Sequence, residues 1–273
     1  MAWSKLKTII IILLAAVDLL LAGLALHLHE QTRQQHLAAQ ADLAALFAAD
    51  DIAFEPATLP DENGLLLPCS TTRNADAEQT AAAALLGSVT ETSFTVGTRT
   101  FTSDRGTAVF SADGSFTITP VDGAVPLSGT AARQAERWLR DMGLEAVLTD
   151  TEETEETLRL TYTQTVEDQP VFACTVDFLF SPDALLSCSG RCFLGELQPY
   201  GIETNLSLST LLLRFRNDVT GSGDLCSAIT ALDYGYRAPA AYGGSLSPVL
   251  RVRTNIGDYF VDLSTAALER AVV

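Results

Sequence analysis

The feature that most constrains this chain is an apolar run near its N-terminus. Thr8 to Leu26 is 19 residues long and carries one charged residue, Asp18. With ~1.5 Å of rise per residue, a helix over this run is about 28 Å long, close to the hydrocarbon thickness of a bilayer. We therefore predict a transmembrane helix at residues 8–26. Lys5 and Lys7 precede it, and the basic flank of a span stays on the cytoplasmic side, so residues 1–7 are placed in the cytoplasm.

A cleaved signal peptide is the alternative interpretation of this run. Gly23 and Ala25 are small residues at a suitable cleavage position. The run is longer than the usual core of a signal peptide, however, and the segment after it reads as a continuing helix. We expect the helix to be retained as an anchor in the cell membrane, with the C-terminal domain extracytoplasmic.

Asp18 lies near the middle of the predicted span. A carboxyl group at that depth costs ~2.5–3.5 kcal/mol on insertion scales, and such groups usually face a protein partner. Ala15 lies about one turn before it and Ala22 one turn after it, which lets a second helix approach closely. We predict that Asp18, Ala15 and Ala22 contact a transmembrane helix of a partner. A protonated carboxyl group tolerated by an apolar helix is the alternative.

The chain is strongly acidic. Its formal net charge is -17, and its lysines, Lys5 and Lys7, both precede the apolar run. Binding of nucleic acid requires a basic surface that neutralises phosphates, so nucleic acid is excluded as a partner. A surface of one charge sign ordinarily serves solubility.

The residues after the span divide into two parts. Residues 27–68 are predicted to form a juxtamembrane helix and then a linker marked by Pro56, Pro60, Gly64 and Pro68. Residues 69–273 are predicted to form an extracytoplasmic α+β domain, in which one helix followed by an antiparallel meander occurs three times. These repeated helix-plus-antiparallel-meander units are expected at about 75–120, 128–194 and 207–263.

Apolar spacing and capping residues predict helices at Ala75–Leu86, Ser128–Met142 and Ser207–Val219. Trp138 should pack the second helix onto the strands of its unit, and Leu212 and Phe215 should do the same for the third. Thr151–Glu156 is expected to be a solvated acidic loop. The predicted strands are Ser93–Phe101, Thr107–Ser111, Ser115–Thr119, Thr157–Val166, Val171–Phe180, Leu185–Leu194, Leu225–Tyr236, Val249–Thr254 and Tyr259–Leu263. Turns are expected at Asp113-Gly114, Gln169-Pro170 and Pro182-Asp183.

Two stretches of the chain resemble the YycI family, also called WalI, and more loosely its paralogue YycH. Residues 3–22 resemble the family's opening, and residues 232–268 resemble its closing strands. The matching residues are Trp3, Lys7, Thr8, Ile9 and Asp18 in the first stretch, and Gly235, Tyr236, Pro248, Arg251, Tyr259, Val261 and Asp262 in the second. Two departures are Val249-Leu250, where the family usually has a Trp, and Ser264-Thr265-Ala266, where it has Thr-Gly.

These families are membrane-anchored regulators of an essential sensor histidine kinase of Gram-positive bacteria. The resemblance implies a non-enzymatic regulator whose partners are the sensor histidine kinase, a YycH-like sister regulator and the membrane itself. An anchored envelope module that binds or inhibits proteases, or binds cell-wall polymers, is the alternative. A cysteine- or carboxylate-dependent hydrolase is the least favoured of the three.

Residue types needed for common catalytic sites are missing from the predicted domain. All histidines (His27, His29 and His36) precede it, and it contains no lysine, G-x-S-x-G motif or suitably placed G-x-G-x-x-G motif. We therefore predict no enzyme activity and no cofactor. We also predict no metal site, because His29 and His36, seven residues apart, seldom complete one.

The chain has five cysteines, an odd number. If Pro182-Asp183 is a hairpin tip, Cys174 falls opposite Arg191, and a shift of one residue would bring Cys174 and Cys192 face to face. Buried free thiols are the simpler expectation, because cysteine packs well as a small apolar residue. A disulfide is the alternative in an extracytoplasmic domain.

Overall fold

The structure is a computed structural model, and it describes residues 41–54, 60, 66–95, 97–201, 205–223 and 225–271. The predicted span at residues 8–26, with Ala15, Asp18 and Ala22, lies outside the described residues. Among those that are described, no helix combines the length and the apolar character needed to cross a membrane.

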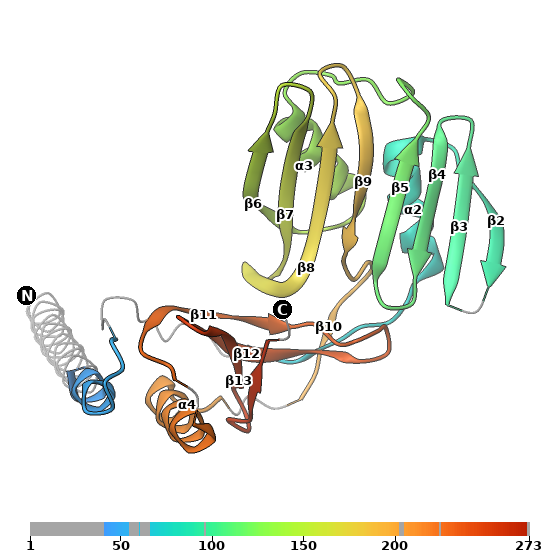
Figure 1. Ribbon diagram of the computed structural model, residues 1–273. Helices are drawn as coiled ribbons and strands as arrows, with labels where there is room; N and C mark the ends of the chain where they lie inside the picture. The colour runs from blue at the N-terminus through green and yellow to red at the C-terminus, as the bar shows by residue number, and fades with distance from the viewer. Residues whose placement is uncertain are drawn as a thin grey trace, which may run out of the picture.

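The described part has α+β organisation, as predicted, and strands predominate over helices (Figure 1). Its helices are α2 (Ala75–Leu86), α3 (Ala131–Asp141) and α4 (Leu208–Ser222), and residues 41–48 are also helical. The strands are β1 (Cys69–Ser70), β2 (Thr90–Thr95), β3 (Thr98–Ser103), β4 (Gly106–Ser111), β5 (Ser115–Pro120), β6 (Ala146–Glu153), β7 (Leu158–Val166), β8 (Gln169–Phe180), β9 (Leu185–Arg191), β10 (Gln198–Pro199), β11 (Ile229–Arg237), β12 (Ser245–Thr254), β13 (Gly257–Asp262) and β14 (Leu268–Arg270).

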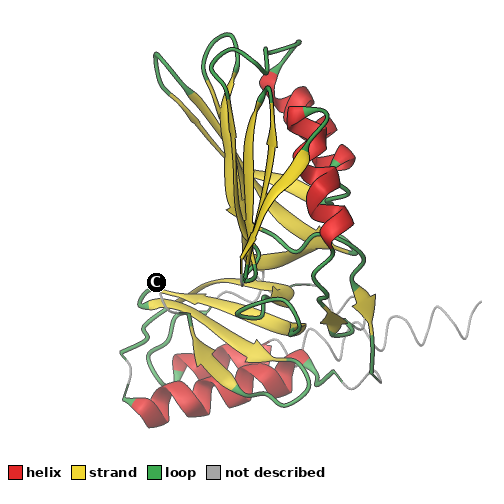
Figure 2. Cartoon of the chain, turned by 90° about the vertical axis from the view of Figure 1, so that its right-hand side faces the viewer, coloured by secondary structure: helices red, strands yellow, loops and turns green. Residues whose placement is uncertain are grey.

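The first two predicted units share one antiparallel sheet, called here the N-terminal sheet. Its strand order is β6-β7-β8-β9-β5-β4-β3-β2. The two units are joined by β5 and β9, which pair antiparallel with Ile118 opposite Cys188. Both α2 and α3 cover the same face of this sheet, and no helix of the described residues covers the opposite face (Figure 2). The repeat is therefore confirmed as a pattern of elements, but two repeats together build one layer.

Helix α3 packs on the N-terminal sheet through Trp138, as predicted. The Trp138 ring stacks on the rings of Phe178 and Phe180, with centroids 5.9 and 6.1 Å apart. Thr130 caps the start of the helix by accepting a hydrogen bond from the backbone N–H of Arg133. Such a cap satisfies one of the free N–H groups of the first turn, which explains why the helix begins at Ala131 rather than Ser128.

The third unit forms a second sheet, called here the C-terminal sheet, from β11–β14 with the short strands β1 and β10. Helix α4 packs on it through Leu212 and Phe215, as predicted, and the Phe215 and Tyr259 rings meet edge to face at 5.5 Å. Residues 41–54 join the same core. Phe47 and Ile52 are buried in it, and the backbone N–H of Ala53 bonds to Ser227 O at 2.8 Å.

Strand β8 belongs to both sheets. Its first residues pair in parallel with β11, with Val171 opposite Tyr236, and its later residues pair antiparallel with β7 and β9. The strand changes direction at Ala173, whose φ is 63°. This value lies in the left-handed region, where an extra residue in a strand forms a bulge and bends it.

Several local predictions are wrong. Ser93–Phe101 is not one strand, because the chain reverses between β2 and β3, where Gly97 has φ 89°. The turn predicted at Gln169-Pro170 is formed instead by Glu167 and Asp168, both with positive φ. The first three residues of the acidic loop predicted at Thr151–Glu156 are instead the end of strand β6. The side chains of these residues are exposed, so the carboxylates remain in water.

The close approach of β8 to β11 requires a glycine at position 235. A Cβ atom there would lie 2.5 Å from the carbonyl oxygen of Pro170 and 2.7 Å from the Phe172 ring. We expect Gly235→Ala to lower the free energy of unfolding by about 1–3 kcal/mol, because overpacking forces the backbone to shift. Chemical unfolding followed by circular dichroism measures this.

Gly221→Ala is the matched control, because it lies in α4 and a Cβ atom there would meet nothing within 4 Å. Alanine is the better helix former, so this change should stabilise the chain by at most about 1 kcal/mol. Equal unfolding midpoints for the two variants would contradict the close packing of β8 on β11.

Candidate functional site

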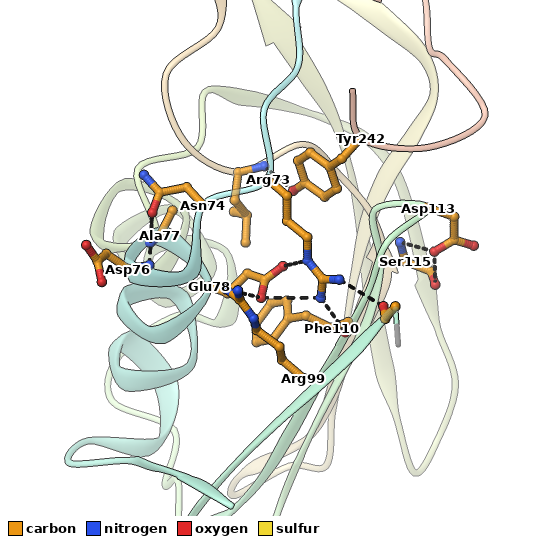
Figure 3. A network of polar contacts seen from close by, with 12 residues as sticks. Arg73, Asn74, Asp76, Ala77, Glu78, Arg99, Phe110, Asp113, Ser115 and Tyr242 are labelled. Carbon is orange, nitrogen blue, oxygen red and sulfur yellow. Dashed lines mark hydrogen bonds and ion pairs between the residues drawn. The ribbon is translucent and has the colours of Figure 1, made fainter. Parts of the chain in front are cut away.

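The part of the structure with the most buried polar chemistry is the junction between the two sheets. It brings together the start of α2, the tip of the β4–β5 hairpin, the residues after β9, and the loop between β11 and β12 (Figure 3). We call its charged centre, Arg73, Glu78 and Arg99, the junction network.

Glu78 is the buried anion of this network, with its side chain 1% exposed. It lies in the first turn of α2, where a carboxylate interacts favourably with the helix dipole. Its Oε1 accepts a hydrogen bond from Arg73 Nε at 2.6 Å, and its Oε2 lies 3.5 Å from Arg99 Nη1. Because a buried charge is costly unless it is paired and hydrogen-bonded, these two arginines are what allow the carboxylate to be buried.

Arg73 also ties the strands to the helix. Its Nη1 donates to the carbonyl oxygen of Gly97 at 2.9 Å, and its Nη2 donates to that of Phe110 at 3.0 Å. In Figure 3 the guanidinium lies between Glu78 and the Phe110 carbonyl. The rigid fork of an arginine suits such a multiple contact, which a lysine could not reproduce. Beside it, Asn74 caps α2 by accepting hydrogen bonds from the N–H groups of Asp76 and Ala77.

Tyr242 brings the C-terminal sheet to this place. Its hydroxyl oxygen accepts a hydrogen bond from the backbone N–H of Leu194 at 2.8 Å, and its backbone N–H donates to Ala112 O. Its ring meets that of Phe193 edge to face, with centroids 5.0 Å apart. Burial raises the pKa of Tyr242, so the phenol stays protonated across the physiological range.

Two further side chains close the junction. Gln164 exchanges two hydrogen bonds with the backbone of Phe193, at 2.9 and 3.0 Å, and all of these atoms are buried. Arg191 donates to the carbonyl oxygens of Asp113 and Pro239, which belong to different sheets. Hydrogen bonds from the hydroxyl and N–H of Ser115, together with the charge of Arg191, hold the pKa of Asp113 below its usual value, although burial acts in the opposite direction. The contacts of Arg191 and Tyr242 thus fix the two sheets to each other at this junction.

The uncovered face of the N-terminal sheet is a second candidate surface. Side chains that point away from α2 and α3 form a continuous row across all eight strands. In register from β2 to β6, the row is Ser93, Thr100, Val109, Thr117, Ser189, Asp177, Thr161 and Asp150. It carries hydroxyl groups and carboxylates and little apolar surface, and it suits hydrogen bonding rather than hydrophobic contact.

Neither surface was predicted from the sequence. The row of side chains on the uncovered face, called here the hydroxyl row, does have a signal in the sequence. The segments TRTFT, SFTIT and TYTQT contain alternating threonines, and the two-residue period of a strand places these on one face. The junction network has none, since Arg73, Arg99 and Tyr242 meet only through the fold. Of the residues in the family resemblance, Arg251 lies on the face of the C-terminal sheet opposite α4. There it pairs with Asp233 at 2.8 Å and lies over the Phe172 ring.

The cysteines are free thiols, and all five are buried. A register shift between Leu179 and Phe180 does set Cys174 level with Cys192 along the ladder. The two thiols nevertheless pack in different cores, Cys174 with the C-terminal sheet and Cys192 with the N-terminal sheet. In the described part of the chain, no three His, Cys, Asp or Glu residues are grouped so as to hold a metal ion.

Comparisons with known proteins give only distant likenesses. No protein-family model and no curated protein sequence matches the chain. One similar structure is the crystal structure of an uncharacterized protein from Eubacterium rectale, with 10% sequence identity and a TM-score of 0.44. The superposition covers 75% of this chain and 85% of the Eubacterium rectale chain. The YpeB C-terminal domain of Bacillus megaterium is also 10% identical, with a TM-score of 0.39, covering 75% of this chain and 100% of its own. At such low TM-scores neither likeness supports a functional conclusion, and the resemblance to the YycI family stays a prediction.

Removing the buried carboxylate should disrupt the junction network. We expect Glu78→Ala to lower the free energy of unfolding by about 3 kcal/mol, because breaking a buried ion pair leaves its partner charges uncompensated. The matched control is Glu152→Ala, whose pair with Arg159 is exposed at 3.6 Å and should contribute at most about 1 kcal/mol. Equal losses in urea unfolding would mean that Glu78 is solvated in the protein.

The thiols should be unreactive while the chain is folded. Burial raises the pKa of Cys174 to about 12 and also raises that of Cys188 and Cys192. A raised pKa leaves little of the reactive thiolate at pH about 8. A colorimetric thiol reagent should therefore react slowly with native protein, and with all five cysteines after unfolding without reductant. Fewer than five would reveal a disulfide.

Proposed function

We propose that this chain is a membrane-anchored, non-enzymatic regulator of a two-component sensor histidine kinase. It acts through contacts of its transmembrane helix and its extracytoplasmic domain with the kinase and with a YycH-like sister regulator. The sequence of the span and the family resemblance of residues 3–22 and 232–268 suggest this partner class.

The observation that carries the proposal is the broad sheet face that neither α2 nor α3 covers and that stays open in the described part of the chain. A helix-backed sheet with one bare, hydroxyl-rich face offers a protein partner a large area and many hydrogen-bond positions. Arg191, Tyr242 and β8 link this sheet to the C-terminal sheet, which residues 41–54 connect toward the predicted span. A partner bound on the outside is therefore mechanically connected to the anchor.

Regulation by such contacts requires different affinities for two states of the kinase. A bound regulator can shift the kinase only by the difference between its binding free energies for those states. Contacts at two places, in the membrane and outside it, let one state of the kinase satisfy both and the other only one. This is the sense in which the anchor and the domain would act together.

The transmembrane contact is testable at Asp18. Because an interhelical hydrogen bond in a membrane contributes about 0.6–1.7 kcal/mol, Asp18→Leu should weaken association with the partner about 3- to 20-fold. Insertion should be unaffected or improved, because the change removes a polar group from hydrocarbon. Co-purification from membranes, with mass identification of the partner, measures the association, and phosphorylation of the kinase measures the output.

Asp18→Asn is the matched control, because an amide keeps the hydrogen bond without the charge. It should retain most of the partner recovery and most of the kinase output. If Asp18→Leu changes neither, the transmembrane mechanism is wrong. If the protein recovered is an envelope protease, the kinase assignment is wrong and the alternative, an anchored inhibitory module, replaces it.

A further inference from the structure

Strand β6 is an edge of the N-terminal sheet, and its outer side is open in the part of the chain that the structure describes. Within the described residues it pairs with β7 alone. Every residue of the strand after Ala146 is exposed, so both of its faces as well as its outer edge meet solvent. An edge strand presents unpaired N–H and C=O groups, which form a template for a further strand.

The beginning of β6 is apolar. Val147 is 55% exposed and Leu148 is 41% exposed. They lie on opposite faces of the strand, since Val147 pairs with Thr163 and Leu148 with Tyr162. An added strand would therefore find an apolar contact on each side of the sheet at this end, where protein surfaces more often carry polar residues.

The other end of β6 runs into a hollow of about 260 Å³. Its lining includes the apolar side chains of Leu127, Leu158 and Phe180 and the exposed carboxylates of Glu153, Glu155 and Glu156. A lining that combines apolar and acidic groups matches a lysine or arginine side chain, which buries its aliphatic stem and keeps its charged end in water.

Charge decides between the occupants of this edge. An antiparallel pair of two β6 strands would bring the carboxylates of Asp150, Glu152 and Glu153 from both copies close together, and like charges at such distances destabilise a sheet. A basic strand would instead be attracted by these carboxylates. The carboxylates alone would be an ordinary solvated surface. The open edge of β6, with the exposed Val147 and Leu148, is the further evidence for a docking site.

We propose that the β6 edge binds an extended, basic segment of a partner protein, which continues the N-terminal sheet by backbone hydrogen bonds. Apolar side chains of the segment contact Val147 and Leu148, and a lysine or arginine enters the hollow beside Glu153. In this mode the backbone supplies affinity and alternate side chains supply specificity. The inference rests on the proposed function, because it requires a protein partner, and it names the surface and the chemistry of that partner.

The probe for this site is a synthetic valine–lysine peptide, with two adjacent valines to meet Val147 and Leu148 and lysines toward Glu153, tested on the full chain in detergent micelles. It should bind and slow hydrogen exchange of the β6 amides, while those of β2, the opposite edge, should not change. A valine–glutamate peptide should not bind. A valine–lysine peptide with a central proline should bind weakly, because proline lacks the N–H that the ladder needs. Raising the salt from about 0.1 M to about 1 M shortens the screening length from about 10 Å to about 3 Å and should weaken binding.

Variants distinguish the effect of the carboxylates at the hollow on peptide binding from the effect of the overall charge of the protein. A triple change, Glu153→Gln, Glu155→Gln and Glu156→Gln, should weaken peptide binding about tenfold, as expected for the loss of three exposed ion pairs. The control removes three exposed carboxylates elsewhere, Asp104→Asn, Asp141→Asn and Asp168→Asn, and should leave binding within about twofold. Leu148→Thr should weaken binding without changing the charge.

Three results would overturn the proposal. The first is equal binding of the valine–glutamate peptide. The second is protection that is confined to amides outside β6. The third is an equal loss of affinity in the two triple variants. A concentration-dependent dimer that protects β6 would make a second copy the occupant and would also overturn it. The outcome is separable from that at Asp18, because peptide binding at β6 does not involve the transmembrane helix. Either proposal can thus fail while the other holds.

Discussion

Strand β8 is the element on which the two-sheet arrangement depends. To serve both sheets it must leave one ladder and enter another within a few residues, and it does so at Ala173, in a left-handed conformation that costs a non-glycine residue roughly 1–2 kcal/mol. That cost is offset on both sides of the bend. Before it, Phe172 packs against Phe260 and lies beneath Arg251, and Gly235 leaves room for the backbone of Pro170. After it, Val176, Phe178 and Phe180 form the centre of the core beneath α3. Without these contacts, nothing would offset the cost of the left-handed conformation at Ala173.

The junction network adds a polar constraint to this apolar one. A buried ion pair is seldom a large net source of stability, because desolvation of the charges offsets much of their attraction. What it does provide is geometry: Glu78 accepts hydrogen bonds only when α2, β3 and the segment before α2 lie in one arrangement. Arg191 and Tyr242 impose the same demand between the β4–β5 tip and the loop after β11. The two sheets are therefore held in one orientation by groups that would be left unsatisfied in any other.

Sequence patterns were enough to predict the helices and most of the hairpins, because these depend on local chemistry. Asn74, Thr130 and Ser207 cap α2, α3 and α4, and Trp138 and Phe215 lie on apolar faces that the 3.6-residue period reveals. The errors arose where tertiary context decides. A run of acidic residues is a strand in β6 because β7 offers it an edge, and the reversal after β2 depends on a single glycine. The joining of two repeats through β5 and β9 could not be predicted, since nothing local in Ile118 or Cys188 specifies a partner so distant in the chain. The junction network was missed for the same reason, whereas the hydroxyl row was readable from alternating threonines.

The same alternation also explains why the N-terminal sheet can present a bare face and an open edge without losing stability. Its core needs only one face, which α2 and α3 cover, so the other face is free to carry threonine, serine and aspartate, residues that keep a strand extended while they remain hydrated. At β6 the helices do not cover the sheet completely, since Leu148 remains exposed. Closing this edge with another strand would bury that leucine and satisfy the free backbone groups, and like-charge repulsion opposes a second copy there. An edge that carries carboxylates and is apolar at one end would favour a basic segment over a second copy of the chain, and such a preference would suit the proposed role as a regulator of one particular partner.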